Sequence, residues 1–535
     1  MDKIFYNGKI YSMDKAGSTY EAVGISEGKI AFLGTNSEAM EINCGDKKDL
    51  DGKTVLPGFI DSHIHCVTYA WYENCVKLHG AKSLKDVLEL TRSYMEGRDF
   101  SGGKWIIGRG WNHFNFDVPE IFTRQDLDSV CRDVPVAYLR SCGHVCVVNT
   151  KAMEIILELD AAKPFLHEID REKGIMHENA ARLFLKAIPA FDKEELAKLI
   201  SFAGEKLNEC GITGIHSDDV RSLPVKSKYE TLEAFKLLKD SGRLNVRIYC
   251  LNTYDSAEQI DEYIADGYKT GQGDDMFRIG PVKIITDGAL GGKTAALTDP
   301  YAGTEDKFGI LHYNAEQLEK IVSRCRENGL DITIHAIGDR AMENAVQAVK
   351  ISNEKFGDST RRHGVLHSQV AMEETLREMG RQNMQAFIQP VFVGSDMDVA
   401  EKLISNHENK KLYAWKSMLD AGMNVSGSAC SPVEKFNVLE NIQYAVTREK
   451  LDRGPEGGWL PQERLTVKEA VELFTVNGAY ASYEEDVKGT LEKGKLADMV
   501  VLYGDIFETE QHKIKDLLVL QTILGGKTVY KGKSL

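Results

Sequence analysis

Two histidines, His63 and His65, follow the apolar run from Val55 to Ile60. Residues two positions apart in an extended chain point to the same side, so both imidazoles can bind one metal ion. A His-x-His pair is a weak signal on its own, because two surface histidines at a strand end give the same pattern. Its meaning therefore depends on which other residues can reach the same ion.

Three further β-prone segments carry residues of this kind near their ends: Lys283, His335 and His367. In a barrel of parallel strands, the C-terminal strand ends and the loops after them form the active site, so these side chains and the histidine pair should converge. Imidazole suits zinc and related transition metals, whereas the few carboxylates at these positions disfavour calcium or magnesium. We therefore expect a divalent metal site, with zinc as the favoured ion.

The segments that must position these residues alternate between helical and β patterns. The predicted strands are 211–216, 246–251, 280–285, 331–335, 363–367, 385–389 and 424–428. The predicted helices are 193–210, 229–241, 315–328, 342–356, 373–383 and 413–421. Parallel strands joined by crossover helices explain this rhythm economically. The sequence thus predicts an α/β fold, a (β/α)8 TIM-like barrel spanning residues 58–489.

Both chain ends are rich in short β segments separated by turns, including a Gly525-Gly526 turn typical of a hairpin. Residues 1–57 and 490–535 are therefore predicted to pair into one β-sandwich accessory domain. Residues from about 68 to 176 interrupt the helix and strand rhythm, and we expect them to form an insertion near the barrel mouth.

Several segments resemble the amidohydrolase superfamily, in the amidohydrolase-3 branch that contains N-substituted formamide deformylase and many uncharacterised relatives. The similar segments are Leu56 to His65, Trp105 to Trp111, Arg140 to Asn149, Val282 to Ala295, His335 to Ala341 and Gly489 to Leu502. The resemblance implies a metal-dependent hydrolase that uses metal-activated water on a C–N amide-type bond of a small molecule.

The resemblance also implies how the histidines divide between two metal ions. His63 and His65 would bind the more buried ion, and His335 and His367 would bind the second. Whether one ion or two are bound is left open by the residues themselves.

Lys283 has two interpretations. The resemblance implies that carbon dioxide converts it to N6-carboxylysine, a catalytic and metal-bridging group, because a carbamate replaces a cation by an anionic oxygen ligand. The alternative is an ordinary ion pair between Lys283 and Asp287.

The last predicted strand departs from the family pattern. Where the family has Gly-Ser-Asp-x-Pro-Val, with a metal-binding aspartate, this chain has Ser426-Gly-Ser-Ala-Cys-Ser-Pro-Val433. Counting back from Pro432 places Cys430 at the aspartate position, and counting forward from Gly427 places Ala429 there. We assign Cys430 as a catalytic candidate, which could be a soft zinc ligand, a base or nucleophile, or a silent replacement.

The missing aspartate keeps two other functions open. One is a metal-dependent isomerase or lyase on the same fold, since these reactions place acid and base groups differently from water activation. The other is a non-catalytic homologue, because a fold alone does not fix a function.

Five weaker candidates are assigned to substrate binding: His144, Arg109, Trp111, His216 and Asp396. A set of aromatic residues suggests an apolar-lined pocket, although core packing explains the same residues: Trp71, Tyr72, Trp105, Trp111, Phe114 and Phe116.

Charge and hydropathy limit the partners of the chain. Its formal net charge of −15 argues against nucleic acid as the main partner, since phosphate recognition needs a basic surface. There is no apolar run of about 18 residues that would cross a membrane, and the first residues lack the apolar core of a signal peptide. We expect a cytoplasmic protein with a small-molecule substrate, either as a monomer or as a homodimer.

Overall fold

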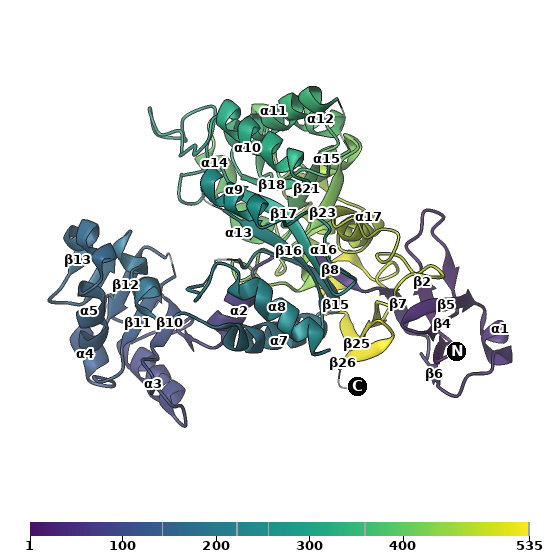
Figure 1. The fold of residues 1–535 in the computed structure, drawn as a ribbon, viewed down its shortest axis with the longest axis horizontal. Coiled ribbons are helices and arrows are strands. Elements are labelled where there is room, and N and C mark those ends of the chain that lie inside the picture. Colours follow the sequence, from purple (N-terminus) through teal and green to yellow (C-terminus); the bar gives the residue numbers. More distant parts are fainter. Residues whose placement is uncertain (142, 221–222, 255, 358–359, 533–535) are drawn as a thin grey trace. The chain divides into compact units, whose positions relative to one another are not determined.

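The computed structural model describes residues 1–141, 143–220, 223–254, 256–357 and 360–532 (Figure 1). The chain divides into two compact units. The first comprises Met1–Cys66, Ser201–Asp219 and Phe235–Leu535. The second comprises Val67–Ile200 and Val220–Ala234.

Eight parallel strands form the central sheet of the first unit, in the order β23-β21-β19-β18-β17-β16-β15-β8. They are β8 (Phe59–Ile64), β15 (Ile212–Ser217), β16 (Arg247–Thr253), β17 (Phe277–Ile285), β18 (Ile332–Ala336), β19 (Gly364–His367), β21 (Gln385–Ile388) and β23 (Asn424–Gly427). The two outermost strands also meet, because the Cys430 amide just after β23 donates to the His63 carbonyl of β8 at 2.9 Å. The sheet is therefore nearly closed, as in a TIM-like barrel.

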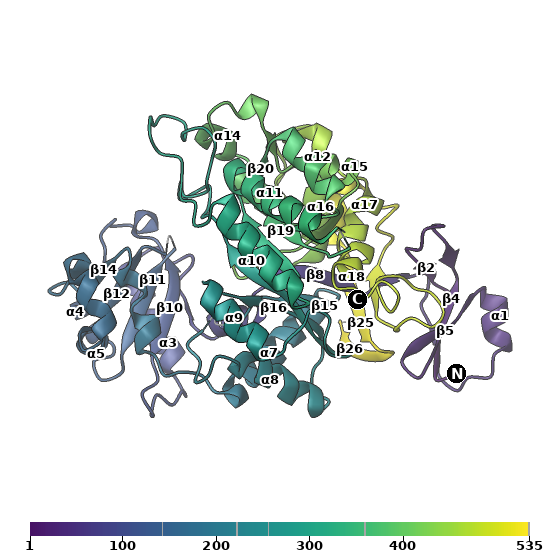
Figure 2. The same cartoon turned by 45° about the horizontal axis from the view of Figure 1, so that its top comes forward.

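Helices lie outside these strands, among them α10, α11, α12 and α15 (Figures 1 and 2). The series runs α7 (Lys193–Glu209), α8 (Glu230–Asp240), α9 (Ala257–Ala265), α10 (Ala315–Glu327), α11 (Asp339–Phe356), α12 (Glu373–Arg381) and α15 (Trp415–Asp420). Each of the predicted helices and strands has a counterpart close to its predicted position. Among the described helices, none combines the length and the apolar character needed to cross a membrane.

The two chain ends meet in a six-stranded sheet of order β26-β25-β24-β7-β2-β3. These strands are β2 (Lys9–Tyr11), β3 (Thr19–Tyr20), β7 (Thr54–Pro57), β24 (Met499–Tyr503), β25 (Leu518–Leu524) and β26 (Lys527–Lys531). A second sheet, β5-β4-β1-β6, is built from β1 (Lys3–Tyr6), β4 (Ala22–Ser26), β5 (Lys29–Gly34) and β6 (Lys47–Asp49). Phe5, Ile25, Val55, Met499 and Ile523 belong to one apolar core. The ends thus share a sheet and a core, and a separate β-sandwich domain stays a prediction.

The second unit contains a six-stranded sheet of order β13-β14-β12-β11-β10-β9. Its strands are β9 (Val76–Lys77), β10 (Ile106–Trp111), β11 (Val136–Arg140), β12 (Val145–Val148), β13 (Ile169–Asp170) and β14 (Ile175–His177). Helices α3 (Leu84–Met95) and α4 (Arg124–Asp128) contribute Val87 and Leu127 to a core shared with Tyr138 of β11. The unit extends beyond the predicted insertion, to Ile200 and to residues 220–234.

A buried ion pair joins the barrel to the returning chain end. Arg247 begins β16, and its Nε lies 2.6 Å from Oδ2 of Asp498, while Nη2 lies 2.8 Å from Oδ1. Both side chains are 5% exposed. The same carboxylate accepts the Gly525 amide at 2.8 Å, so it also holds the turn between β25 and β26. A paired, planar fork of this kind compensates for the loss of water around both charges.

Replacing Asp498 with alanine is expected to destabilise the first unit, because the Arg247 guanidinium stays buried without its counter-charge. The expected loss is about 3–5 kcal/mol of unfolding free energy, measured by urea denaturation. The control is Glu316→Ala, whose pair with Lys320 is 78% and 68% exposed and should contribute little, because solvent screens the two charges. Equal losses in the two variants would contradict a role for burial.

Candidate metal centre

Six residues singled out from the sequence lie at or just after the C-terminal ends of barrel strands. They are His63 and His65 with β8, Lys283 with β17, His335 with β18, His367 with β19 and Cys430 after β23. The ring centroids of His63 and His65 are 5.0 Å apart, those of His63 and His367 5.9 Å, and those of His335 and His367 4.5 Å. The structure therefore brings the four predicted histidines into one cluster.

His63 is the most informative member of the cluster. It has no exposed surface, and among the described residues neither of its ring nitrogens has a hydrogen-bond partner. Burial, with a further contribution from Lys283, lowers its pKa well below the ordinary value, so the ring is neutral. Buried, unpaired polar atoms are costly and rare. A neutral imidazole is also the form that binds metal, so the His63 nitrogens fit a ligand role.

The other three histidines each have one ring nitrogen held by a protein oxygen. His65 donates from Nδ1 to the main-chain oxygen of Asp218, His367 donates from Nδ1 to Oε1 of Gln389 at 2.7 Å, and His335 donates from Nε2 to the Gly288 carbonyl at 3.2 Å. Metal-binding histidines typically anchor one nitrogen in this way and present the other to the ion. The donor set therefore fits a transition metal.

Gln389 was not among the sequence candidates, yet it orients His367. Its Nε2 donates to Oγ of Ser428 at 2.8 Å and to the Phe387 carbonyl at 3.2 Å. These two acceptors fix the amide so that its oxygen faces the His367 ring. The sequence alone does not indicate this contact, because it depends on how side chains from neighbouring strands pack.

Changing Gln389 to leucine should weaken zinc binding about 10–100-fold, because His367 loses the acceptor that fixes its ring. Competition with a chromophoric chelator measures the affinity. Gln385→Leu is the matched control, since Gln385 is also buried but begins β21 and donates to the Arg362 carbonyl. Equal affinities of the Gln389 variant and the wild type would rule out this positioning role.

Asp218 is a second residue that the sequence interpretation missed. It follows β15, is 3% exposed, and forms a buried ion pair with Lys283. Its Oδ2 lies 3.9 Å from Nε2 of His65, and it forms, with His63 and His65, a group whose ligand atoms lie within 4.8 Å of one another. Burial would raise the pKa of Asp218, but the Lys283 charge holds it below the ordinary value. Asp218 could have been identified in the sequence as an acidic residue that lies two positions after the predicted strand 211–216.

The alternative prediction, an ion pair between Lys283 and Asp287, is wrong. The partner of Lys283 is Asp218 and not Asp287, because the Asp287 carboxylate is occupied by the amides of Gly338 at 2.8 Å and Ala296 at 3.0 Å. These two hydrogen bonds connect the loop that contains Ala296 with the loop that contains Gly338. Burial raises the pKa of Asp287 to about 7.

Cys430 follows the last strand, in the segment 426–433, which has no acidic residue of its own. It is 5% exposed, and its Sγ belongs with His63 and His367 to a group whose ligand atoms lie within 4.8 Å of one another. Burial raises the pKa of its free thiol to about 12. The neighbouring Ala429 instead donates its amide to the buried Asp61 at 3.1 Å. Counting back from Pro432 thus identifies the residue that faces the cluster.

Two of the weaker candidates belong to the first unit. His216 is buried on β15, with its ring centroid 5.0 Å from that of Tyr249, and burial lowers its pKa to about 3. Asp396 accepts from Oη of Tyr413 at 2.5 Å and from Nε2 of Gln369 at 3.3 Å. Substrate contact by either residue stays a prediction.

The other three weaker candidates belong to the second unit. Trp111 is fully buried and donates its indole N–H to the Tyr138 carbonyl at 2.9 Å, so it packs in the core of this unit, and its contact with a substrate stays a prediction. The Arg109 guanidinium lies 4.7 Å from the centroid of the Tyr72 ring. His144 is 62% exposed and lies 2.9 Å from Glu178.

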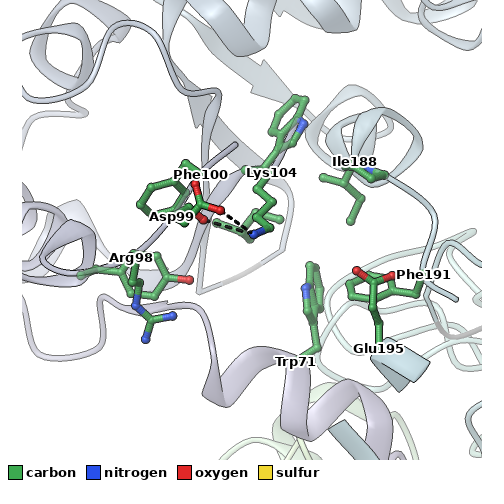
Figure 3. Close-up of a pocket in the computed structure, with 12 residues that line it drawn as sticks. Trp71, Arg98, Asp99, Phe100, Lys104, Ile188, Phe191 and Glu195 are labelled. Atoms are coloured by element: carbon green, nitrogen blue, oxygen red, sulfur yellow. Dashed lines mark hydrogen bonds and ion pairs between the residues drawn. The ribbon is translucent and has the colours of Figure 1, made fainter. Parts of the chain in front are cut away.

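A pocket of about 400 Å³ lies within the second unit (Figure 3). It is lined by aromatic side chains, namely Trp71, Tyr94, Phe100, Trp105 and Phe191, together with charged groups that include an Asp99–Lys104 pair at 3.5 Å. Trp71 and Trp105 come from the predicted aromatic set, whereas Phe116 packs in the core and Phe114 is 72% exposed. The volume and lining suit a small organic molecule.

A family model described as the amidohydrolase family matches residues 48–530. The chain belongs to the amidohydrolase family. This amidohydrolase is 28% identical to the YtcJ protein of Bacillus subtilis over 99% of its own length and 100% of the relative. It is 24% identical to the N-substituted formamide deformylase of Arthrobacter pascens, over 99% and 98% of the two chains.

Solved structures agree with this assignment. An uncharacterized metal-dependent hydrolase from Pyrococcus horikoshii OT3 is similar with a TM-score of 0.81 and 27% identity, covering 95% of this chain and 99% of the other. A second one, from Pyrococcus furiosus, gives a TM-score of 0.79 at 27% identity, with 95% and 100% covered. The likeness extends over nearly the full length of the amidohydrolase chain.

Proposed function

We propose that this amidohydrolase cleaves a C–N amide-type bond of a small molecule with the help of zinc or a related divalent metal held by the histidine cluster. The strongest support for a bound metal is His63, which is fully buried and whose two ring nitrogens have no partner among the described residues. The names of two relatives support the proposal, since one is a formamide deformylase and the other a metal-dependent hydrolase.

His63, His65, His335 and His367 would hold the metal, because each can present a ring nitrogen to it. Such an ion supplies Lewis acidity, which polarises a substrate carbonyl and lowers the pKa of a water molecule. Asp218 provides a buried carboxylate close to His65 and is suited to accept a proton at Oδ2.

Lys283 is proposed to become N6-carboxylysine. The ammonium group first loses one proton to give the neutral amine. The amine nitrogen then forms a bond to the carbon of carbon dioxide as one C=O π bond breaks, and loss of a second N–H proton leaves an anionic carbamate. This replaces the cation of the ion pair with Asp218 by a like charge, so the carbamate would need a new positive charge nearby. A divalent metal held by the histidines would supply that charge.

Carboxylation predicts a carbamate carbon signal in the ¹³C NMR spectrum of zinc-loaded protein incubated with ¹³C-bicarbonate. Lys283→Arg keeps a positive charge beside Asp218 but cannot form the carbamate, so its spectrum should lack the signal. Lys410→Arg serves as the control, because Lys410 is another buried lysine with a carboxylate partner, Asp339, at 2.6 Å. A spectrum of the wild type without the signal would leave Lys283 as an ion-pairing residue.

The function is tested with a panel of N-formyl and N-acyl amines in water enriched in oxygen-18. Hydrolysis should release the amine and place one labelled oxygen in the acid. A labelled product supports hydrolysis, and an unlabelled rearranged or cleaved product would favour the isomerase or lyase alternative. If the metal-loaded wild type is inactive and Cys430→Asp is active, the protein is a non-catalytic homologue.

Removing both His63 and His65 by alanine substitution should lower kcat/KM by about a thousandfold or more, because a catalytic metal contributes several kcal/mol. Metal content, measured by elemental analysis, should fall in parallel. His407→Ala is the control, since the His407 side chain is 42% exposed and lies beside Glu408, outside the histidine cluster. Activity that survives in the double variant would overturn the proposal.

A further inference from the structure

Cys430 lies at the point where the barrel closes. Its amide donates to the His63 carbonyl, which places the segment after β23 directly beside the end of β8. One residue earlier, the Ala429 amide donates to Asp61, whose carboxylate also accepts the His63 amide at 3.0 Å. The backbone around Cys430 is thus held in register with the backbone of His63.

The surroundings of the Cys430 thiol differ from those of cysteines that only pack. Cys75 donates from Sγ to the Trp71 carbonyl at 3.3 Å, and Sγ of Cys66 lies 3.6 Å from Oγ of Ser217. Cys430 Sγ instead faces imidazole nitrogens of His63 and His367, within 4.8 Å and with all three side chains buried.

A second, independent observation points to a ligand at this place. His63 has no exposed surface and two ring nitrogens without partners among the described residues. The His367 ring is held at Nδ1 by Gln389, which leaves Nε2 for another partner. A buried thiol, the His63 imidazole and the Nε2 atom of His367 form a donor set typical of zinc.

The backbone conformation of Cys430 supports the same interpretation. Its φ of 53° lies in the left-handed region, which costs a residue with a side chain of this kind about 1–2 kcal/mol. Strain of this type persists mainly where function requires a particular side-chain direction. Aspartate adopts the left-handed region more readily than most residues, so the family's aspartate and this cysteine can occupy the same position.

We propose that Cys430 is itself a metal ligand, and that with His63 and His367 it forms a nitrogen–sulfur zinc site. The inference rests on the proposed function and deepens it by naming the ligand that replaces the family's aspartate. On binding, the Cys430 S–H bond breaks, its proton passes to solvent, and the sulfur binds the ion as a thiolate. Since a thiolate favours zinc over magnesium or manganese, the site should be selective for zinc.

This assignment changes the division of roles within the site. A carboxylate has two oxygens, so it can hold a metal with one and receive a proton on the other. A thiolate has a single donor atom and cannot do both. Proton transfer is therefore assigned to Asp218, the buried carboxylate that groups with His63 and His65.

X-ray absorption at the zinc edge of the zinc-loaded protein tests the ligand directly. The wild type should show one sulfur scatterer at about 2.3 Å beside nitrogen or oxygen at about 2.0–2.1 Å. Cys430→Asp should keep its zinc and lose the sulfur. Cys325→Ser is the matched control, because Cys325 is a buried free cysteine of α10, and its spectrum should equal that of the wild type.

The outcomes separate this inference from the proposed function. A wild type that binds no zinc would overturn both. Zinc bound with nitrogen and oxygen alone, or a sulfur signal that persists in Cys430→Asp, would overturn the Cys430 assignment and leave the histidine site intact. If the variant does not fold, alkylation of the wild type decides: zinc should slow modification of Cys430 at least tenfold, and an unchanged rate would reject the ligand role.

Discussion

The closing contact between β8 and the segment after β23 is the constraint on which the histidine cluster depends. It consists of the hydrogen bond between Cys430 and His63 and of the Asp61 carboxylate that accepts the amides of His63 and Ala429. Burial raises the pKa of Asp61 to about 8, but the two amide donors oppose that shift. Because a strand register moves in whole residues, a slip here would turn the His63 side chain to the other face of the sheet.

The sequence predicted the barrel well because each strand and helix carries its own periodic signal. The predicted strands 211–216 and 385–389, for example, correspond to β15 and β21. The histidines could be assigned because strand ends of a barrel share one edge, whatever the loops between them do. The strand and helix patterns are local, and the rule about strand ends holds for any barrel. Neither depends on where the side chains lie.

Other features depend on contacts that no local pattern encodes. Gln389 orients His367 only because β19 and β21 are neighbours in register, and Lys283 pairs with Asp218 because Asp287 is already occupied by backbone amides. The second unit also includes residues 220–234, which follow the predicted insertion in the chain by more than 40 residues. Trp111 was hard to interpret for another reason. An aromatic residue in a segment that resembles the family gives the same sequence pattern whether it packs in a core or contacts a substrate.

The sheet made by the chain ends has a consequence for synthesis on the ribosome. β7 directly precedes the first barrel strand, yet its neighbour β24 lies more than 400 residues later in the chain. During translation, the edge of β7 that pairs with β24 stays exposed until β24 has been synthesised. An exposed strand edge can pair with other chains. A nascent chain that stalls before β24 is therefore expected to be a substrate for chaperones, with its barrel strands already formed.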